Sequence, residues 1–411
     1  MQDKDSIKST RPRILAVTDV PFWKRNRGSA RRIDSLLGWL SCRFPVTVCQ
    51  VGQFPVGQWD RAIRELPMPL TGPGQPALWQ RWLNRLVSPA AAGCPPEVDD
   101  LADPGPVELQ DFRSPAIEQY VTDQARQEDV DVVLIEYVMF AWLAERIREQ
   151  HPRARIVVDT HDVMHLRKSE FERVGLSHWL EIDRASETAA LSGADAVIAI
   201  QQADARELSR MLPDRRVLLA GWACPAEPAP PRSSADRPVT IGFLGSRGAA
   251  NRISLEWFLR NSWPRLRERT GQPLCLLIGG PLDPVAVEQT ELAQIRFAGA
   301  VADPDDFYRQ LDIAINPAQI HSGFKIKSLE ALARGVPLVT TAAGAAGLEP
   351  AIGQGAVVAD GPAEFARQLS DWVADAGLRH RLAEAAGNAV RQHFAPDVVY
   401  AQLARWLDAE S

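Results

Sequence analysis

The sequence predicts an α/β protein made of two doubly wound domains, each built on a parallel sheet. Three observations support this prediction. Short apolar runs alternate along the chain with stretches of helical periodicity, and such alternation is typical of parallel sheets with helices on both faces. The length of 411 residues is large for one hydrophobic core. A proline-rich segment at 222–238 divides the pattern into two series, and we place the domain boundary there.

The first series predicts an N-terminal domain at residues 1–222. It opens with an apolar strand at 13–18, followed by a loop rich in arginine and lysine and by an amphipathic helix at 30–42. Further strands are expected at 46–51, 132–136, 156–160, 196–200 and 217–220, with helical stretches such as 179–191 and 201–212 between them. Strands that alternate with helices in this way are parallel and joined by right-handed crossovers.

Residues 53–115 do not follow the alternation. This segment holds many prolines and glycines together with Trp59, Trp79 and Trp82. Two interpretations stay open, an inserted helical hairpin or a partly mobile loop at the binding site. We therefore treat 53–115 as an insertion or variable region of the first domain.

The second series predicts a C-terminal domain at residues 238–394. Its strands are expected at 239–244, 274–278, 295–298, 312–316, 336–340 and 356–359. Helical stretches at 362–374, 378–394 and 396–409 close the chain. Apart from the similarity of the two α/β halves, the sequence shows no internal repeat.

Composition excludes several classes of protein. Hydrophobic residues make up 45% of the chain and charged residues 24%, which is ordinary for a soluble globular protein. A net charge of −6 argues against a general nucleic-acid binder. No apolar run approaches the roughly 20 residues that span a bilayer, and the first ten residues lack the apolar region of a secretory signal.

The five cysteines favour a cytoplasmic protein with reduced thiols. They are scattered along the chain without any Cys-x-x-Cys pair, unlike the cysteines of a disulfide framework or a zinc site. We therefore expect no structural metal.

The most informative motif joins the strand at 312–316 to a helix that begins near Ile326. Gly335 and Pro337 end this helix. Lys325, Lys327 and Glu330 thus lie where a buried parallel strand passes into a helix, the edge at which open α/β sheets bind ligands. A helix N-terminus beside two lysines attracts an anion, most simply a phosphate.

A second group of polar residues follows two strands of the first domain. His161 and Asp162 come directly after the strand at 156–160, and Glu136 and Tyr137 end the strand at 132–136. The carboxyl ends of parallel strands meet at one edge of a sheet, so we expect these four residues at the interdomain face.

Four segments together carry a family resemblance. They are residues 21–31 with Gly28-Ser29-Ala30-Arg31, the loop 245–251, the stretch 323–337 and the loop 341–348. In these segments the sequence resembles the retaining GT-B glycosyltransferases of the large group-one type. The resemblance covers nearly the whole chain except 53–115, and the combination is more specific than any one segment.

This resemblance implies two Rossmann-like domains that face a cleft, with the C-terminal helix at 395–411 crossing back to the N-terminal domain. It implies a metal-independent, hexosyltransferase-like enzyme without a cofactor. The sugar of a nucleoside-diphosphate sugar, bound mainly by the C-terminal domain, would pass to a glycan, lipid-linked or protein acceptor bound mainly by the N-terminal one. In the retaining mechanism implied, the leaving phosphate helps to deprotonate the acceptor hydroxyl, and no protein nucleophile is required.

The resemblance also assigns residues. The family places two glutamates, separated by seven residues, around the helix start, one near the donor sugar and one on the ribose. Here Ser322 stands at the first position and Glu330 at the second. Arg247 would hold the diphosphate together with Lys325 or, in second place, Lys327. A histidine near position 161 contacts the donor sugar in the family, and Asp162 would orient it or meet the acceptor.

The predicted site therefore has three parts. The catalytic residues are His161, Arg247 and Lys325. The acceptor-binding residues are Asp162, Glu136 and Tyr137. The donor-binding residues are Gly28, Gly245, Ser246, Gly248, Ser322, Gly323, Phe324, Lys327 and Glu330.

Other interpretations stay open for several of these residues. Lys327 and Glu330 are three apart and could form only a surface pair. Arg247 could be a solvated loop residue, and His161-Asp162 a turn that caps a helix. Because Ser322 replaces the family glutamate, the chain could be a nucleotide-sugar-binding partner with little turnover. An epimerase or hydrolase on the same fold would need a carboxylate pair for acid/base chemistry, and we find none in the sequence.

A basic cluster precedes and opens the first helix. It consists of Lys24, Arg25, Arg27, Arg31 and Arg32. Either it is a solvated loop before a core-facing helix, or it attracts an anionic membrane or a phosphate-bearing acceptor. The second reading would place the protein peripherally at the inner membrane face.

Overall fold

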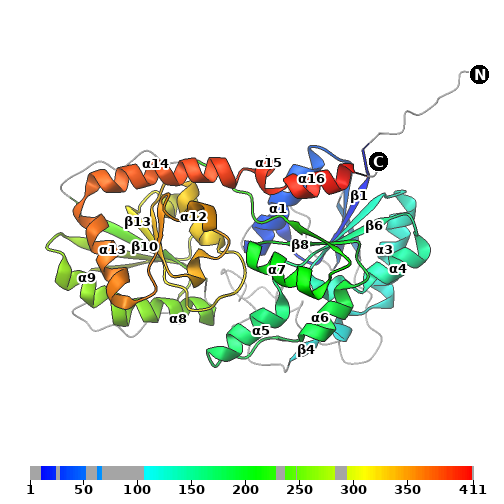
Figure 1. Ribbon diagram of the computed structural model, residues 1–411, viewed down its shortest axis with the longest axis horizontal. Helices are drawn as coiled ribbons and strands as arrows, with labels where there is room; N and C mark the ends of the chain where they lie inside the picture. Colours follow the sequence, from blue (N-terminus) through cyan, green and yellow to red (C-terminus); the bar gives the residue numbers. More distant parts are fainter. Residues whose placement is uncertain are drawn as a thin grey trace, which may run out of the picture.

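The computed structural model describes residues 11–24, 28–51, 63–66, 106–227, 237–246, 248–282 and 294–409. In these residues the chain forms two α/β domains that lie side by side (Figure 1). Each domain is built on a parallel sheet with helices on both faces, as the alternating sequence pattern predicts. Two doubly wound parallel-sheet domains are therefore confirmed.

The N-terminal domain contains a seven-stranded sheet in the order β3-β2-β1-β5-β6-β8-β9. Its central strands are continuous buried apolar runs, as expected when helices cover both faces. The strand order reverses between β1 and β5, which makes the carboxyl ends of these strands a ligand-binding position. The strands are β1 (Ile14–Thr18), β2 (Val46–Val51), β3 (Ile63–Leu66), β5 (Val132–Glu136), β6 (Arg155–Asp159), β8 (Ala196–Ala199) and β9 (Arg216–Leu219).

The C-terminal domain contains a six-stranded parallel sheet in the order β12-β11-β10-β13-β14-β15. Here the order reverses between β10 and β13, so the second ligand-binding edge lies beyond these strands. The strands are β10 (Val239–Leu244), β11 (Leu274–Gly279), β12 (Ile295–Gly299), β13 (Ile313–Asn316), β14 (Leu338–Thr340) and β15 (Ala356–Val358).

Helices cover both faces of each sheet (Figure 1). Those of the N-terminal domain are α1 (Gly28–Ser41), α3 (Pro115–Gln127), α4 (Leu143–Gln150), α5 (Met164–Arg173), α6 (Arg184–Leu191) and α7 (Gln202–Met211). Those that follow along the chain are α8 (Ala249–Trp257), α9 (Trp263–Arg269), α11 (Pro304–Tyr308), α12 (Ile326–Ala333), α13 (Pro362–Ala374), α14 (Ala376–His393), α15 (Pro396–Val399) and α16 (Ala401–Asp408).

The chain ends on the domain where it began. After α14, helices α15 and α16 lie against the N-terminal domain (Figure 1). Tyr400, Leu403 and Leu407 pack into the hydrophobic core that includes Ile33 and Leu36 of α1. The Arg155 side chain donates hydrogen bonds to the carbonyls of residues 406 and 407, at 2.7 and 2.9 Å, which satisfies the end of α16.

One predicted helix is wrong in its first turn. The sequence pattern suggested a helix at 179–191, but Leu180–Glu181 forms a short strand, β7, that pairs with β4 (Val107–Glu108). Helix α6 begins only at Arg184, because Asp183 caps it by accepting a hydrogen bond from the Ser186 N–H at 2.7 Å. Aspartate is a typical N-cap residue, but the apolar periodicity of 179–191 indicated an earlier start of the helix.

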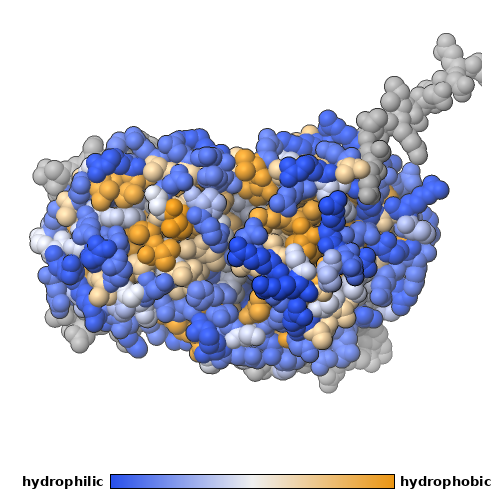
Figure 2. Space-filling model, viewed as in Figure 1, coloured by the Kyte–Doolittle hydropathy of each residue, from blue (hydrophilic) through white to orange (hydrophobic). Residues whose placement is uncertain are grey.

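Much of the irregular region at 53–115 lies outside the described residues. The described parts are β3, which extends the sheet beside β2, and the segment from residue 106 onward with β4 and the start of α3. Within the described chain, no helix combines the length and apolar character needed to cross a membrane. The face shown in Figure 2 carries hydrophilic side chains over α7 and apolar patches toward the middle of the molecule.

Candidate functional site

The predicted site residues gather where the two domains meet. In this region the ends of β5 and β6 approach the loop before α12. Three hydrogen bonds join α5 and the loop before α12. The Arg173 side chain donates to the carbonyl of Gln319 at 2.9 Å, and the His321 N–H donates to the Glu170 carboxylate at 3.0 Å. The Arg167 guanidinium donates to the Ser322 hydroxyl at 3.4 Å.

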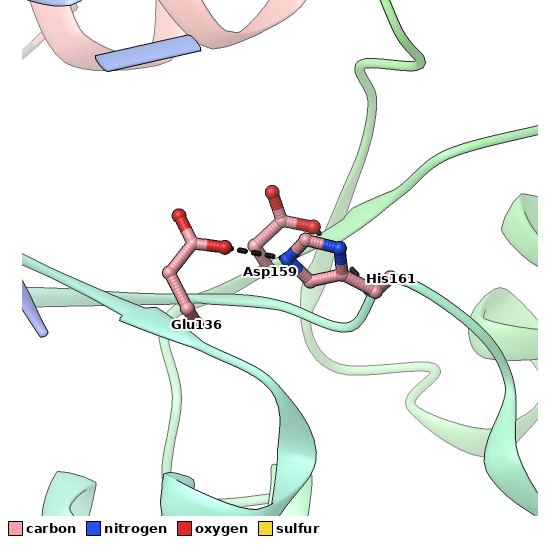
Figure 3. Close-up of side chains that lie close together, drawn as sticks. All are labelled: Glu136, Asp159 and His161. Atoms are coloured by element: carbon pink, nitrogen blue, oxygen red, sulfur yellow. Dashed lines mark hydrogen bonds and ion pairs between the residues drawn. The ribbon is translucent and has the colours of Figure 1, made fainter. Parts of the chain in front are cut away.

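His161 is tied to Glu136 on the neighbouring strand. Its Nε2 lies 2.6 Å from the Glu136 carboxylate, and both side chains are buried. Figure 3 shows one edge of the imidazole turned to the Glu136 carboxylate, with Asp159 beside both residues. Strands β5 and β6 pair so that Glu136 lies opposite Asp159, which brings the two strand ends together.

The Tyr137 ring stacks on His161. The ring centroids are 4.0 Å apart and the planes differ by 11°. Both residues have left-handed backbone conformations, with φ of 72° at Tyr137 and 58° at His161. This conformation is uncommon for residues other than glycine, and such strain gathers at functional sites. The hydroxyls of Tyr137 and Ser29 are hydrogen-bonded, which connects the pair to the first turn of α1.

A buried arginine completes this cluster. Arg32 of α1 forms an ion pair with Asp159 and donates to the carbonyl of Ala220 at 2.7 Å. Burial raises the pKa of Glu136 and Asp159 raises it further, while His161 and Arg32 oppose the shift. Glu136, Asp159 and His161 lie close enough together to suggest a metal site. Arg32 already supplies the positive charge next to these carboxylates, so the geometry fits a hydrogen-bonded ion cluster better than a cation site.

The Glu136 side chain has no exposed surface, and its carboxylate is directed at His161. Glu136 ends β5, a strand that is buried throughout because helices cover both faces of the sheet. Side chains alternate along a strand, so Glu136 lies on the same face as Val132 and Leu134, which share a core with α1. Glu136 is therefore placed to contact His161, whereas the sequence suggested a contact with an acceptor.

Glu330 lies at the interdomain surface of α12. Its side chain is 4% exposed and forms an ion pair with Arg31 of α1, whose side chain is 25% exposed. The Tyr308 hydroxyl approaches the other carboxylate oxygen at 3.4 Å and donates to the carbonyl of Lys327 at 2.9 Å. Glu330 is thus held in place and does not form the surface pair with Lys327 that its spacing allowed.

Lys327 lies beside the loop between β10 and α8. Its ammonium group donates to the Asn251 side chain, and it sits 5.1 Å from the centre of the Phe243 ring. The Asn251 amide in turn donates to the Ser246 hydroxyl at 2.8 Å. Lys327 and Ser246 are therefore neighbours, as expected for two donor-binding residues. Arg247 lies outside the described residues.

Glycines bring backbone segments close together in the same loop. A side chain at Gly280, where φ is 109°, would collide with the carbonyl of Gly245. Gly248 forms the start of α8 with an ordinary φ of −59°. Gly248 thus directly precedes the N-terminus of α8, where backbone N–H groups can meet an anion.

Lys325 faces the other domain. Its ammonium group donates to the carbonyls of Ile320, at 3.2 Å, and Ser322. Burial lowers its pKa to about 8, although the nearby Asp162 opposes the shift. Lys327, and not Lys325, is the lysine that the structure brings to the β10 loop.

The remaining predicted donor residues pack against the N-terminal domain. Gly323 has φ of 60°, and a side chain there would collide with the Asp162 carboxylate. A side chain at Gly28 would come within 2.6 Å of Ile326. Phe324 lies against Gly221 and Gly347. These contacts bring the start of α1, Asp162 and the loop before α12 together.

Two of the five residues of the basic cluster, Arg31 and Arg32, are engaged inside the described part of the protein. Arg32 is buried against Asp159 and Arg31 pairs with Glu330, so neither belongs to a membrane-facing patch. The Lys24 side chain, Arg25 and Arg27 lie outside the described residues.

Sequence reasoning missed four residues of this region, Asn251, Tyr308, Arg167 and Asp204. Asp204 is buried near Asp162 and Lys325, and burial together with the Asp162 charge raises its pKa to about 7. Each of these residues acquires its neighbours only through long-range folding. The one local signal was the Asn251 side chain at the beginning of a helix that follows a glycine-rich loop.

Comparisons with known proteins agree with this geometry. Residues 238–375 match the family model described as glycosyl transferases group 1. No curated protein matches the chain. Solved structures of similar fold include a sucrose-phosphate synthase from Thermosynechococcus elongatus, at 15% identity and a TM-score of 0.68, covering 97% of this chain and 100% of the other.

Two further structures of similar fold were found. The lipopolysaccharide outer core galactosyltransferase WaaB has 10% identity and a TM-score of 0.60, with coverage of 97% of this chain and 99% of its own. Anabaena HepE in complex with UDP has 14% identity and a TM-score of 0.62, with coverage of 97% and 100%. At such identities the likeness concerns the fold.

Proposed function

We propose that this chain, which is a group 1 glycosyltransferase with the GT-B fold, transfers a sugar from a UDP-sugar to an acceptor hydroxyl with retention of configuration. The acceptor is a glycan, a lipid-linked glycan or a protein. The observation that carries the proposal is the placement of Lys327 and Glu330 on one helix, with Lys327 beside the β10 loop and Glu330 at the domain junction.

In this proposal the diphosphate binds between the β10 loop and the start of α12. The backbone N–H groups after Gly245 and the N-terminus of α12 supply partial positive charge, and Lys327 supplies a full one. Such fixed groups stabilise the negative charge that develops on the departing diphosphate. A metal ion is not needed for this role. Arg247 remains a candidate for a second cation.

Glu330 binds the ribose in this scheme. An ionised carboxylate accepts hydrogen bonds from two adjacent hydroxyls. The hydrogen bond from Tyr308 and the packing of α12 hold the carboxylate in place. Arg31 pairs with the other carboxylate oxygen.

The transferred sugar would lie between the two domains, next to His161. Tyr137 and Asp162 lie nearby on the N-terminal side and are the candidates for contacts with the acceptor. Ser322 cannot supply the carboxylate that its position carries in the family. The Asp162 carboxylate abuts Gly323 and brings a negative group to the same place from the opposite domain.

The preference for a uracil nucleotide rests on the neighbouring structures. HepE was solved with UDP, and also with UDP and glucose. The identity between that structure and this chain is 14%.

The test is a measurement of nucleoside diphosphate release. The protein is incubated with UDP-, GDP- and ADP-sugars, with and without a crude glycan or lipid-linked acceptor fraction. Release that depends on acceptor and on a UDP-sugar supports the proposal. Tight UDP binding without release from any donor would instead favour a nucleotide-sugar-binding partner, the alternative that Ser322 raises. Release from GDP- or ADP-sugars alone would overturn the choice of base.

A further inference from the structure

We propose that Glu136 is a positioning residue for His161. It fixes the imidazole in one orientation and one tautomer, so that Nδ1 is the ring nitrogen presented to a hydroxyl group of the transferred sugar. This inference rests on the proposed function and adds to it a residue that never touches the substrate.

The hydrogen bond between the two side chains sets the tautomer. His161 Nε2 and Glu136 Oε2 are 2.6 Å apart. An ionised carboxylate can only accept a hydrogen bond, so in the proposed state, with Glu136 ionised, the proton of this bond resides on Nε2. When the ring is neutral, Nδ1 then carries a lone pair. Among the described residues Nδ1 has no hydrogen-bond partner, and it is free to accept from a hydroxyl.

Stacking fixes the plane of the ring. Tyr137 covers one face at a centroid distance of 4.0 Å. The left-handed conformations of Tyr137 and His161 turn both side chains back toward each other at the ends of adjacent strands. Conformations of this kind cost about 1–3 kcal/mol each, and they persist only where the surroundings enforce them. Tyr137 covers one face of the ring and Glu136 bonds to Nε2. Nδ1 is therefore the ring nitrogen left to contact a ligand.

His161 and Arg32 favour the ionised, accepting form of Glu136, while burial and Asp159 oppose it. Glu136 faces Asp159, His161 and Arg32, while Asp19 and Asp162 lie near Tyr137. Arg32 forms an ion pair with Asp159, which offsets the negative charge that Asp159 places beside Glu136. One Glu136 oxygen, Oε1, is buried without a partner. A fully buried carboxylate that bonds only to a histidine is better suited to orient that histidine than to contact a substrate.

The test replaces the carboxylate without changing its size. In Glu136→Gln the amide can donate an N–H to Nε2, which moves the histidine proton to Nδ1 and turns the acceptor into a donor. We expect kcat to fall about 10- to 100-fold, the range seen when outer partners of functional histidines are removed. The KM for the UDP-sugar and the Kd for UDP should stay within about twofold, because Lys327 and Glu330 are untouched. Glu136→Asp keeps the charge and should recover part of the activity.

The tautomer is measured independently of activity. Two-dimensional NMR of the imidazole nitrogens, with His161 assigned from a His161→Gln sample, should show an Nε2–H ring in the wild type and a changed ring in Glu136→Gln. The chain offers a matched control in Glu187, a second buried glutamate, which lies 2.7 Å from Nδ1 of His165. Glu187→Gln should alter the His165 signals and leave those of His161 unchanged.

The two readouts separate the possible failures. If the wild type transfers no sugar, the proposed function fails, while the His161 signals still test this inference. If Glu136→Gln keeps the wild-type tautomer, or a changed tautomer leaves kcat within twofold, Glu136 does not position His161 for the reaction. Melting curves of both glutamine variants show whether a lost signal comes from unfolding, and Glu136→Asp then provides the decisive comparison.

Discussion

Arg31 at the start of the first domain forms an ion pair with Glu330 in the second, although 299 residues separate them. Glu330 is the residue that we propose to bind the ribose. The Arg31 side chain, from the opposite domain, thus occupies part of the proposed ribose site. If Glu330 binds the ribose, ribose hydroxyls must compete with Arg31 for its carboxylate.

The first prediction concerns this competition. Arg31→Ala should tighten the binding of uridine, which has ribose but no phosphate, by up to about fivefold, because a partly exposed ion pair contributes up to about 1 kcal/mol. The gain should be smaller for UDP, since Arg31 also attracts the diphosphate. Calorimetry or ligand-observed NMR measures both affinities. Glu330→Ala is the control and should weaken both ligands. A loss of uridine affinity in Arg31→Ala would contradict the competition.

The second prediction compares two neighbouring lysines. Lys327 lies beside the β10 loop, whereas Lys325 is engaged by the carbonyls of residues 320 and 322. Lys327→Ala should weaken UDP by about 10- to 100-fold, as expected for a charge-assisted contact of about 1.5–3 kcal/mol, and should change uridine little. Lys325→Ala should change UDP affinity less than fivefold. If Lys325→Ala weakens UDP binding more than Lys327→Ala does, Lys325 is the lysine that binds the diphosphate, as the sequence alone predicts.

Both lysines show where sequence reasoning reached its limit. The strand and helix pattern predicted the sheet edges correctly, because it depends on local periodicity. It also brought Lys325, Lys327 and Glu330 to a helix start. Their directions differ because Lys325 precedes α12 as its N-cap, with a non-helical φ of −89° and ψ of 77°, whereas Lys327 lies in the first turn of the helix. One lysine therefore meets the β10 loop while the other faces the first domain.

Glu136 illustrates a different limit. A carboxylate at the end of a parallel strand suggested a group that reaches a substrate, but the pairing of β5 with β6 directs it to His161. The contact of Arg31 with Glu330 likewise depends on how the domains sit together. No local sequence pattern encodes such contacts. The sequence therefore indicated which residues belong to the proposed site better than it indicated which of them contact one another.

The third prediction concerns Asp204 and pH. Burial raises its folded-state pKa to about 7, with Asp162 adding to the shift and the Gln201 amide opposing it. An unfolded aspartate ionises near pH 4. Between about pH 4 and pH 7 the unfolded state therefore loses its proton before the folded state does, and stability falls as pH rises. Above pH 7 the penalty is constant.

Asp204→Asn removes this penalty. The variant should have a larger free energy of unfolding than the wild type. This difference should grow by about 2 kcal/mol between pH 5 and pH 8, since each pKa unit corresponds to about 1.4 kcal/mol. Urea titrations at the two pH values measure the difference. Asp214→Asn, which alters an exposed aspartate, should show no such growth. A constant difference for Asp204→Asn at both pH values would rule out the raised pKa.

The fourth prediction tests the final helix. Tyr400 is fully buried, its ring lies 5.1 Å from that of Trp39, and its hydroxyl is 3.1 Å from Ser35 Oγ of α1. Removing a large aromatic ring from a packed core costs about 3–5 kcal/mol. Tyr400→Ala should therefore destabilise the N-terminal domain, although the residue is only 11 positions from the last one. Tyr400→Phe keeps the ring and should cost about 1 kcal/mol for the lost hydrogen bond. Hydrogen exchange shows which domain loses protection. We expect faster exchange in β1, β5 and β6, because α16 packs on the core that these strands share with α1. Faster exchange confined to β10–β15 would show that α16 stabilises the other domain.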